Sequence, residues 1–234
     1  MSLEDNIQRI RNFLLDRYKN NLAAILIFGS ANTNHFVGGK SDIDHMIFLK
    51  TLGGIDTSEE IKLLFDKLKS ENFASQYFNS LKGVKDYIKK RKSFSTYITI
   101  VSKDGSRTVY TTPEFERTRE YLRKHPFTRK EIQEQIQEKD KFELDGYFRE
   151  INDYNLTKAL MSHLRRKLQV INYFKTGKLV FDYESCLKGI SLVKNEREEL
   201  ERLYNLYQKR KSLSKKDVKY YGGLAQKFTE RIIQ

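Results

Sequence analysis

The sequence has few of the residues that build disulfides, flexible linkers and membrane-spanning helices. Cys186 is the only cysteine among 234 residues, so an internal disulfide is impossible. Two prolines and twelve glycines are too few for long flexible linkers. The longest unbroken apolar run, residues 22–28, is far shorter than the roughly 20 residues that cross a bilayer as a helix. These shortages exclude a disulfide scaffold and predict neither a transmembrane helix nor a membrane partner.

The first residues also lack the basic and apolar regions of a secretory signal. A single cysteine fits a reducing compartment, so we expect a cytoplasmic protein. Tryptophan is absent, but 14 tyrosines and 15 phenylalanines supply large apolar side chains for a folded core. This composition argues against disorder.

Positive charge is in clear excess. Lysine and arginine number 44 against 31 aspartates and glutamates, which gives a net charge of +13. Such a surface attracts polyanions, including nucleotides and RNA. Lysines on solvated helix faces, such as those of residues 82–92, explain the same excess without any polymer partner. Both interpretations stay open.

The spacing of apolar residues predicts an α+β fold in two domains. The first domain, 1–125, is expected to hold a small mixed sheet flanked by helices, and the second, 126–234, is expected to be a helical bundle. Strand signals stop after Pro113. The predicted helices of the first domain are 5–19, 57–70 with a capping box that begins at Thr57, and 75–92; the predicted strands are 22–28, 42–50, and a hairpin of 95–102 with 107–111.

Two acids at the start of the second predicted strand carry the clearest chemical signal. Asp42 and Asp44 are separated by one residue, so their side chains point to the same side of a strand while Ile43 points to the other. Carboxylates about 7 Å apart along a strand can converge on one or two hard cations. The pattern therefore predicts a magnesium site at Asp42 and Asp44.

A glycine and a serine follow the first predicted strand. Gly29 permits a tight exit from the strand, and Ser30 can bond a phosphate oxygen. The turn after them can offer backbone N–H groups to a triphosphate. Lys40 and Ser41, just before the acidic pair, are further candidates for nucleotide binding, although a solvated loop lysine is an equal alternative at Lys40.

These motifs resemble the nucleotidyltransferase superfamily that includes polymerase beta. The matching residues are Phe28-Gly29-Ser30 and Asp42-Ile43-Asp44, separated by a spacer of similar length. The α/β-then-helical layout is most like the antibiotic nucleotidyltransferases that act on aminoglycosides and lincosamides, and segments 41–50 and 170–177 are similar to the lincosamide branch. The resemblance implies Mg²⁺-dependent transfer of a nucleoside monophosphate from a nucleoside triphosphate, most often ATP, to a hydroxyl group. It also implies a substrate-binding role for the helical domain.

The chain departs from that family at one point. Such enzymes usually carry a third acid on a later strand, and residues 95–102 contain none. Candidate general bases elsewhere are Asp104, Glu143, Asp145 and Glu150, among which the sequence does not choose. His45 follows Asp44 on the opposite strand face, so we expect a core histidine rather than a ligand.

Three functions remain possible. The first, which we favour, is transfer to a small hydroxylated molecule such as an antibiotic. The second is transfer to RNA or to a protein, as in toxin–antitoxin systems, which the charge of +13 favours. The third is nucleotide binding without catalysis, which the missing third acid favours. The sequence specifies neither the oligomeric state nor the acceptor.

Overall fold

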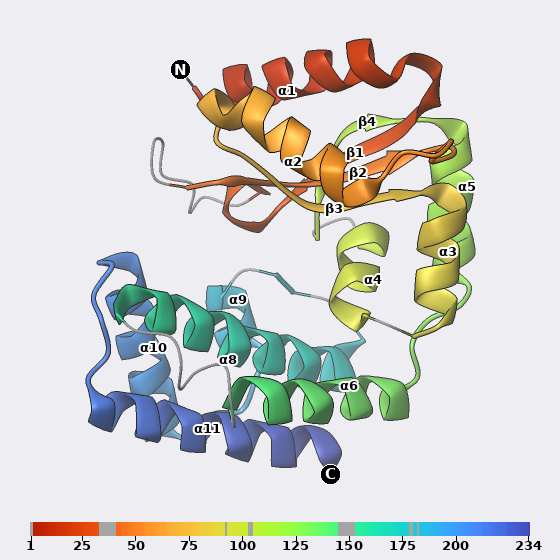
Figure 1. Ribbon diagram of the computed structural model, residues 1–234. Helices are drawn as coiled ribbons and strands as arrows, with labels where there is room; N and C mark the ends of the chain where they lie inside the picture. Colours follow the sequence, from red (N-terminus) through yellow and green to blue (C-terminus); the bar gives the residue numbers. More distant parts are fainter. Residues whose placement is uncertain are drawn as a thin grey trace. The chain divides into compact units, whose positions relative to one another are not determined.

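The computed structural model describes residues 2–32, 41–91, 93–102, 105–144, 153–177, 180–181 and 183–234. The chain divides into two compact units, Met1–Pro126 and Phe127–Gln234. The N-terminal unit combines a sheet with helices, and the described part of the C-terminal unit is helical (Figure 1). The fold is therefore α+β, as predicted from the sequence. In the described part of the chain, no helix is long and apolar enough to cross a membrane.

Within the described residues, four strands form one mixed sheet in the order β3-β2-β1-β4. The central strand β1 runs antiparallel to both β2 and β4, whereas β3 runs parallel to β2. The strands are β1 (Leu22–Phe28), β2 (Ile43–Leu49), β3 (Phe73–Ser80) and β4 (Arg107–Thr111). Strand β1 is apolar throughout because helices cover both of its faces, and every residue from Leu22 to Ile27 is buried.

One face of the sheet packs against helices α1 (Leu3–Tyr18) and α2 (Thr57–Leu68) (Figure 1). Every second residue of β2 points to this face, as the two-residue period of a strand requires. The shared core joins the two helices to the sheet and contains Ile7, Ile10, Leu14, Ile25, Ile27, Ile43, Ile47, Leu49, Leu64 and Leu68.

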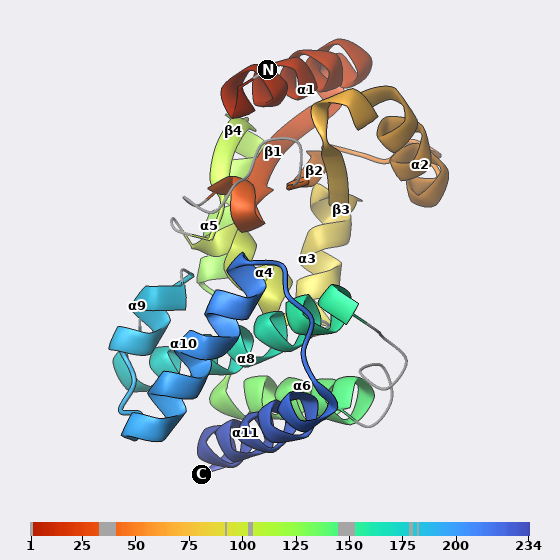
Figure 2. The same ribbon diagram turned by 90° about the vertical axis from the view of Figure 1, so that its left-hand side faces the viewer.

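The other face packs against helices α3 (Leu81–Lys89), α4 (Phe94–Val101) and α5 (Pro113–Arg123) (Figure 2). Phe48 of β2 anchors this side, with its ring centroid 4.9 Å from that of Phe115 in α5 and 5.7 Å from that of Tyr77 in β3. Tyr77 in turn contacts Tyr87 of α3. Asp44 lies four residues before Phe48 on the same strand, so its side chain points to this same face.

Two predicted elements of the N-terminal unit are wrong. Residues 95–102, predicted as a strand, form helix α4, which Ser93 caps by accepting a hydrogen bond from the N–H of Thr96. Most of this helix is buried, so tertiary packing overrides the β-propensity of its branched side chains. Consequently 107–111 has no hairpin partner there, and β4 pairs with β1 instead.

Residues 75–92, predicted as one helix, contain the end of strand β3 and then helix α3. Ser80 marks the change, because its hydroxyl accepts a hydrogen bond from the N–H of Gly83 and so caps α3. The start of α2 also differs from the predicted capping box at Thr57. Asp56 is the cap, and its carboxylate accepts from the N–H groups of Ser58 and Glu59 at 2.8 and 3.0 Å.

The C-terminal unit is organised around its longest described helix, α8 (Asp153–Thr176), which contacts each of the others. These are α6 (Arg129–Phe142), α9 (Tyr183–Lys188), α10 (Lys194–Gln208) and α11 (Lys215–Ile233). Thr128 and Ser214 begin α6 and α11 with capping boxes. The core of this unit includes Leu164 and Leu168 of α8, Leu203 of α10 and Phe228 of α11.

Candidate functional site

Asp44 lies near the start of β2, on the face covered by α3 and α5, and Asp42 immediately precedes the strand. Ile43 is fully buried in the α1 core, which turns its two neighbours to the other side. Asp42 is exposed, and Asp44 is half-buried and paired in register with Phe28 at the end of β1. The pairing with Phe28 places the Asp44 carboxylate beside the turn that leaves β1, and Asp42 directly precedes the strand.

Gly29 lies directly against Asp44. Its φ is +66°, a left-handed conformation that favours glycine. A Cβ atom added to Gly29 would lie 2.3 Å from Oδ2 of Asp44, a separation that real atoms do not tolerate. The absence of a side chain at position 29 thus lets the backbone of the turn approach the carboxylate, which brings the two sequence motifs into contact.

The rest of the predicted nucleotide-binding set lies next to this contact along the chain. Ser30 is half-buried in the short 3₁₀ turn Gly29–Asn32, and Ser41 is half-buried immediately before Asp42. Lys40 lies outside the described residues. The described part of the chain contains no group of three histidine, cysteine or acidic side chains that could hold a metal ion.

His45 belongs to the opposite face and to the core. It is fully buried, its ring stacks on Phe73 with centroids 5.0 Å apart, and its Nδ1–H donates to the carbonyl oxygen of Ile43 at 2.5 Å. Burial lowers the pKa of His45 to about 4, against a small opposing effect of that hydrogen bond. The imidazole is therefore neutral at physiological pH, and it points away from Asp44.

The expected third acid has no counterpart in the described strands. The neighbour of β2 is β3 rather than 95–102, and it places Ala74 beside Asp44. Among the described strands, Asp44 is the only acidic residue. Glu71, just before β3, is buried and accepts hydrogen bonds from Arg9 and Ser70.

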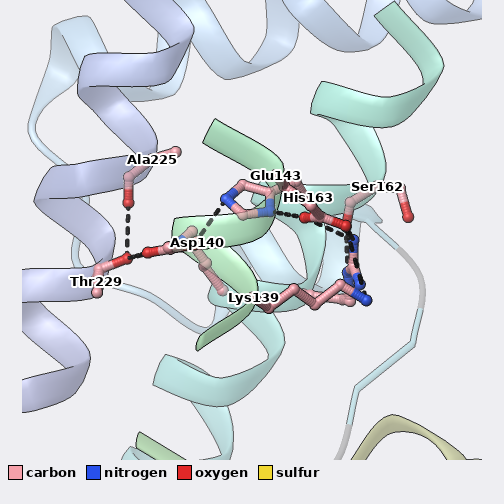
Figure 3. A network of polar contacts seen from close by, with 9 residues as sticks. Lys139, Asp140, Glu143, Ser162, His163, Ala225 and Thr229 are labelled. Atoms are coloured by element: carbon pink, nitrogen blue, oxygen red, sulfur yellow. Dashed lines mark hydrogen bonds and ion pairs between the residues drawn. The ribbon is translucent and has the colours of Figure 1, made fainter. Parts of the chain in front are cut away.

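Glu143, one of the four possible general bases, lies in a buried polar network of the C-terminal unit (Figure 3). Its carboxylate accepts a hydrogen bond from Nδ1 of His163 and pairs with Arg166 at 3.0 Å and Lys139 at 3.7 Å. Burial alone would raise the pKa of Glu143, but the bond from His163 and the charge of Arg166 hold it below its ordinary value. Such a carboxylate is a weak proton acceptor. Asp104, Asp145 and Glu150 lie outside the described residues.

The same network extends to Asp140, which sequence reasoning did not single out. Nε2 of His163 lies 3.0 Å from Asp140, and Nζ of Lys167, with only 1% of its side chain exposed, lies 2.5 Å from it. Thr229 of α11 completes the group. The signal available in the sequence is spacing, because 140 in α6 and 143 at its C-cap lie three residues apart, and 163, 166 and 167 share one face of α8. This arrangement fastens α6, α8 and α11 together.

A polar pocket of about 370 Å³ lies beside the Gly29–Asn32 turn. Sequence reasoning missed it because its residues come from four separate segments of the chain. The described residues that line it are Asn32, Ser102, Ser106, Arg107, Thr108, Arg119 and Arg123.

Comparison with solved structures identifies the fold. The chain is similar to the crystal structure of spectinomycin adenyltransferase AAD(9) from Enterococcus faecialis, solved with ATP and spectinomycin. The TM-score is 0.64, the similarity covers 99% of each chain, and the sequence identity is 12%. No protein-family model and no curated protein sequence match this chain. At this identity the likeness shows a shared fold over the whole length.

Proposed function

We propose that this chain is a magnesium-dependent nucleotidyltransferase, which moves a nucleoside monophosphate from a nucleoside triphosphate, ATP in the first instance, to a hydroxyl group of a small molecule. The contact between Gly29 and the carboxylate of Asp44 carries the proposal. The transferred phosphate must contact a phosphate-binding turn and a metal ion at once, so the turn and the carboxylate that holds the ion must lie side by side. The fold, shared with an enzyme crystallised with ATP, supports the same conclusion.

Asp42 and Asp44 suit Mg²⁺, which prefers carboxylate oxygens and keeps several of its waters. Asp42 is exposed and Asp44 is half-buried, so an ion can be reached from solvent while the strand fixes the carboxylates. Ile43 holds that strand in the α1 core. When bound, Mg²⁺ would neutralise charge on the phosphate oxygens.

The protein residues then bind and orient the nucleotide. Gly29 lets phosphate approach the backbone, and the hydroxyls of Ser30 and Ser41 donate hydrogen bonds to phosphate oxygens. The acceptor oxygen forms a bond to the α-phosphorus as the hydroxyl proton passes to a general base, and the bond from the α-phosphorus to the bridging oxygen breaks, releasing pyrophosphate. Positioning and charge stabilisation supply most of the rate in such transfers. Lys40 stays a predicted phosphate contact.

We assign the acceptor to the class of small hydroxylated molecules, held by the helical unit. The support is the shared fold, because spectinomycin is the small molecule in the AAD(9) crystal. Glu143 suits the role of general base least among the four predicted acids, because its carboxylate already binds three basic side chains. Asp104, Asp145 and Glu150 remain candidates.

One surface favours RNA as an alternative acceptor. Lys85 and Lys89 of α3 hold their ammonium groups 5.5 and 5.7 Å from the ring centroid of Tyr121 in α5. Cations beside an aromatic ring can bind both the phosphates and the bases of a nucleic acid. The net charge of +13 acts in the same direction.

Transfer of ATP labelled at the α-phosphate tests the proposal. The acceptors are a panel of aminocyclitols, aminoglycosides and lincosamides, with bulk tRNA in parallel, at about 50 and 200 mM salt. We expect label in a small molecule, with little effect of salt. Label that appears only in tRNA and falls by orders of magnitude with salt would show that the acceptor is RNA and not a small molecule.

Asp44→Asn provides the matching variant, and Asp66→Asn is its control. Asp66 is an exposed acid of α2, on the other side of the sheet. Asp44→Asn should abolish Mg²⁺-dependent binding of ATP and shift the melting temperature by only a few degrees, whereas Asp66→Asn should bind ATP normally. Normal binding by Asp44→Asn would exclude the proposed metal site, and wild-type binding of Mg–ATP without any transfer would indicate a nucleotide-binding protein that lacks catalysis.

A further inference from the structure

The pocket beside the Gly29–Asn32 turn has the composition of an anion site. Three of its described lining residues are arginines, four carry hydroxyl or amide groups, and none is acidic. A pocket of this kind repels a cationic acceptor such as an aminoglycoside and suits a phosphate group, which arginine binds through paired N–H donors.

The pocket lies on the same face of the sheet as Asp44. Thr108, in its lining, pairs in register with Leu26 of β1, and Leu26 pairs with Met46 of β2. Asp44 is two residues before Met46, so its side chain shares the face of Met46 and Thr108. Two strand spacings, about 10 Å, separate the strand of Asp44 from that of Thr108. Asn32 ends the phosphate-binding turn and also lines the pocket.

Contacts hold Arg119 in place at the pocket. Its guanidinium donates to Oγ1 of Thr108 at 3.0 Å and to Oε1 of Glu116 at 3.1 Å, and it lies over the ring of Phe115 with a centroid distance of 5.0 Å. Only 12% of the side chain is exposed. Its Nε is buried, and among the described residues it has no hydrogen-bond partner. A fixed arginine loses little entropy when it binds a ligand.

The other two arginines are also anchored. Arg107 donates two hydrogen bonds to the carboxylate of Glu4 in α1 at 2.5 and 2.7 Å, which neutralises much of its charge. Arg123 is held by a carbonyl instead, since its Nε donates to Val101 at 3.1 Å. Burial lowers the pKa of Arg119, and the positive charge of Arg123 acts in the same direction against that of Glu116. An anion beside Arg119 and Arg123 would relieve this repulsion.

We propose that this pocket binds the β- and γ-phosphates of the nucleoside triphosphate, with Arg119 and Arg123 as the phosphate-binding residues. The inference rests on the proposed function and adds a site to it. A triphosphate chain whose α-phosphate lies beside Asp44 would pass along the Gly29–Asn32 turn to Asn32 and then reach the arginines. When the bond to the α-phosphorus breaks, its electron pair stays on the departing pyrophosphate. Both arginines stabilise that charge.

Calorimetric titration of the full chain tests the site, with Mg–ATP, AMP and inorganic tripolyphosphate as probes. The variants are Arg119→Gln and Arg123→Gln, and the control is Arg117→Gln on the same helix, an arginine whose side chain is 69% exposed. Each test variant should weaken ATP and tripolyphosphate binding about tenfold to 100-fold, the effect of removing one charged hydrogen bond, and should leave AMP binding unchanged. Because Arg123 is exposed, its variant should fold normally even if Arg119→Gln does not.

The outcomes separate this site from the function on which it rests. If Arg123→Gln binds ATP and tripolyphosphate as the wild type does, while Asp44→Asn loses Mg–ATP, the pocket is excluded and the proposed function stands. If the wild type binds tripolyphosphate through these arginines but shows no Asp44-dependent binding of Mg–ATP, the pocket stands and the proposed function fails. If the arginine variants weaken tRNA binding and leave ATP unchanged, the occupant is a nucleic acid and the inference is wrong.

Discussion

Replacing Gly29 by alanine would push one methyl group into the carboxylate of Asp44. The added Cβ would lie 2.3 Å from Oδ2, whereas ordinary contacts begin near 3.4 Å, so the carboxylate must move by about 1 Å. A displacement of that size at a reacting group typically costs about 100-fold in rate. The left-handed backbone at φ +66° adds strain of about 1–2 kcal/mol, equivalent to roughly 2–8 °C in melting temperature for a chain of this length.

Gly54→Ala separates the two effects. Gly54 has φ +86°, yet a Cβ added there has no heavy atom within 4 Å. Gly54→Ala should therefore lose only the thermal stability that left-handed strain costs, and only Gly29→Ala should lose Mg–ATP binding and turnover. The assays are differential scanning fluorimetry and steady-state nucleotide transfer. Wild-type turnover in Gly29→Ala, or an equal loss of turnover in Gly54→Ala, would refute the idea that this glycine exists to admit the Asp44 carboxylate.

Three further predictions concern stability. Lys167→Met should cost about 3 kcal/mol, because it leaves the partly buried Asp140 carboxylate without its buried ammonium partner; the measurement is urea unfolding, with Lys227→Met, at an exposed lysine of α11, as control. Burial raises the pKa of Asp140, but hydrogen bonds from its partners lower it more, so the pKa in the folded protein lies below the ordinary 3.8. The stability that the ionised carboxylate contributes is complete above pH 3.8 and is lost as the pH falls through the folded pKa. The difference in unfolding free energy between wild type and Lys167→Met should therefore close at that low pH. Asp56→Ala should cost about 1 kcal/mol and Thr57→Ala much less; equal losses would contradict the observed cap of α2.

The sequence predicts the acidic strand well because its signals are local. Strand β1 begins and ends where the apolar run predicts, and β2 begins within one residue of Asp42. An apolar run bounded by polar residues and the alternation around Ile43 depend on neighbours only a few residues apart. The contact of Gly29 with Asp44 required the structure, since it follows from the pairing of Phe28 with Asp44 across two strands.

The errors arise where packing against residues distant in the sequence decides the secondary structure. Residues 95–102 have the composition of a strand, but the Ser93 cap and burial on most sides make them a helix. Strand β3 is predicted as part of a helix because the helical spacing of apolar residues in α3 extends into the strand before it. The arginine pocket depends on β4 joining β1, and the Glu143 network depends on side chains 20 and more residues away. The pocket leaves no local pattern from which it could be predicted, and the helical spacing of the network residues does not show that α6 and α8 pack against each other.

The position of β4 has a consequence for biosynthesis. Strand β1 is complete at Phe28, but β4, its second neighbour, begins only at Arg107. On the ribosome, one hydrogen-bonding edge of this fully apolar strand therefore stays unpaired until the chain beyond Thr111 has left the exit tunnel. An open apolar strand edge is a template for pairing with other chains. The nascent N-terminal unit should thus need chaperone protection over this interval, and variants that delay β4 docking should be lost to aggregation during synthesis even when the finished protein is stable.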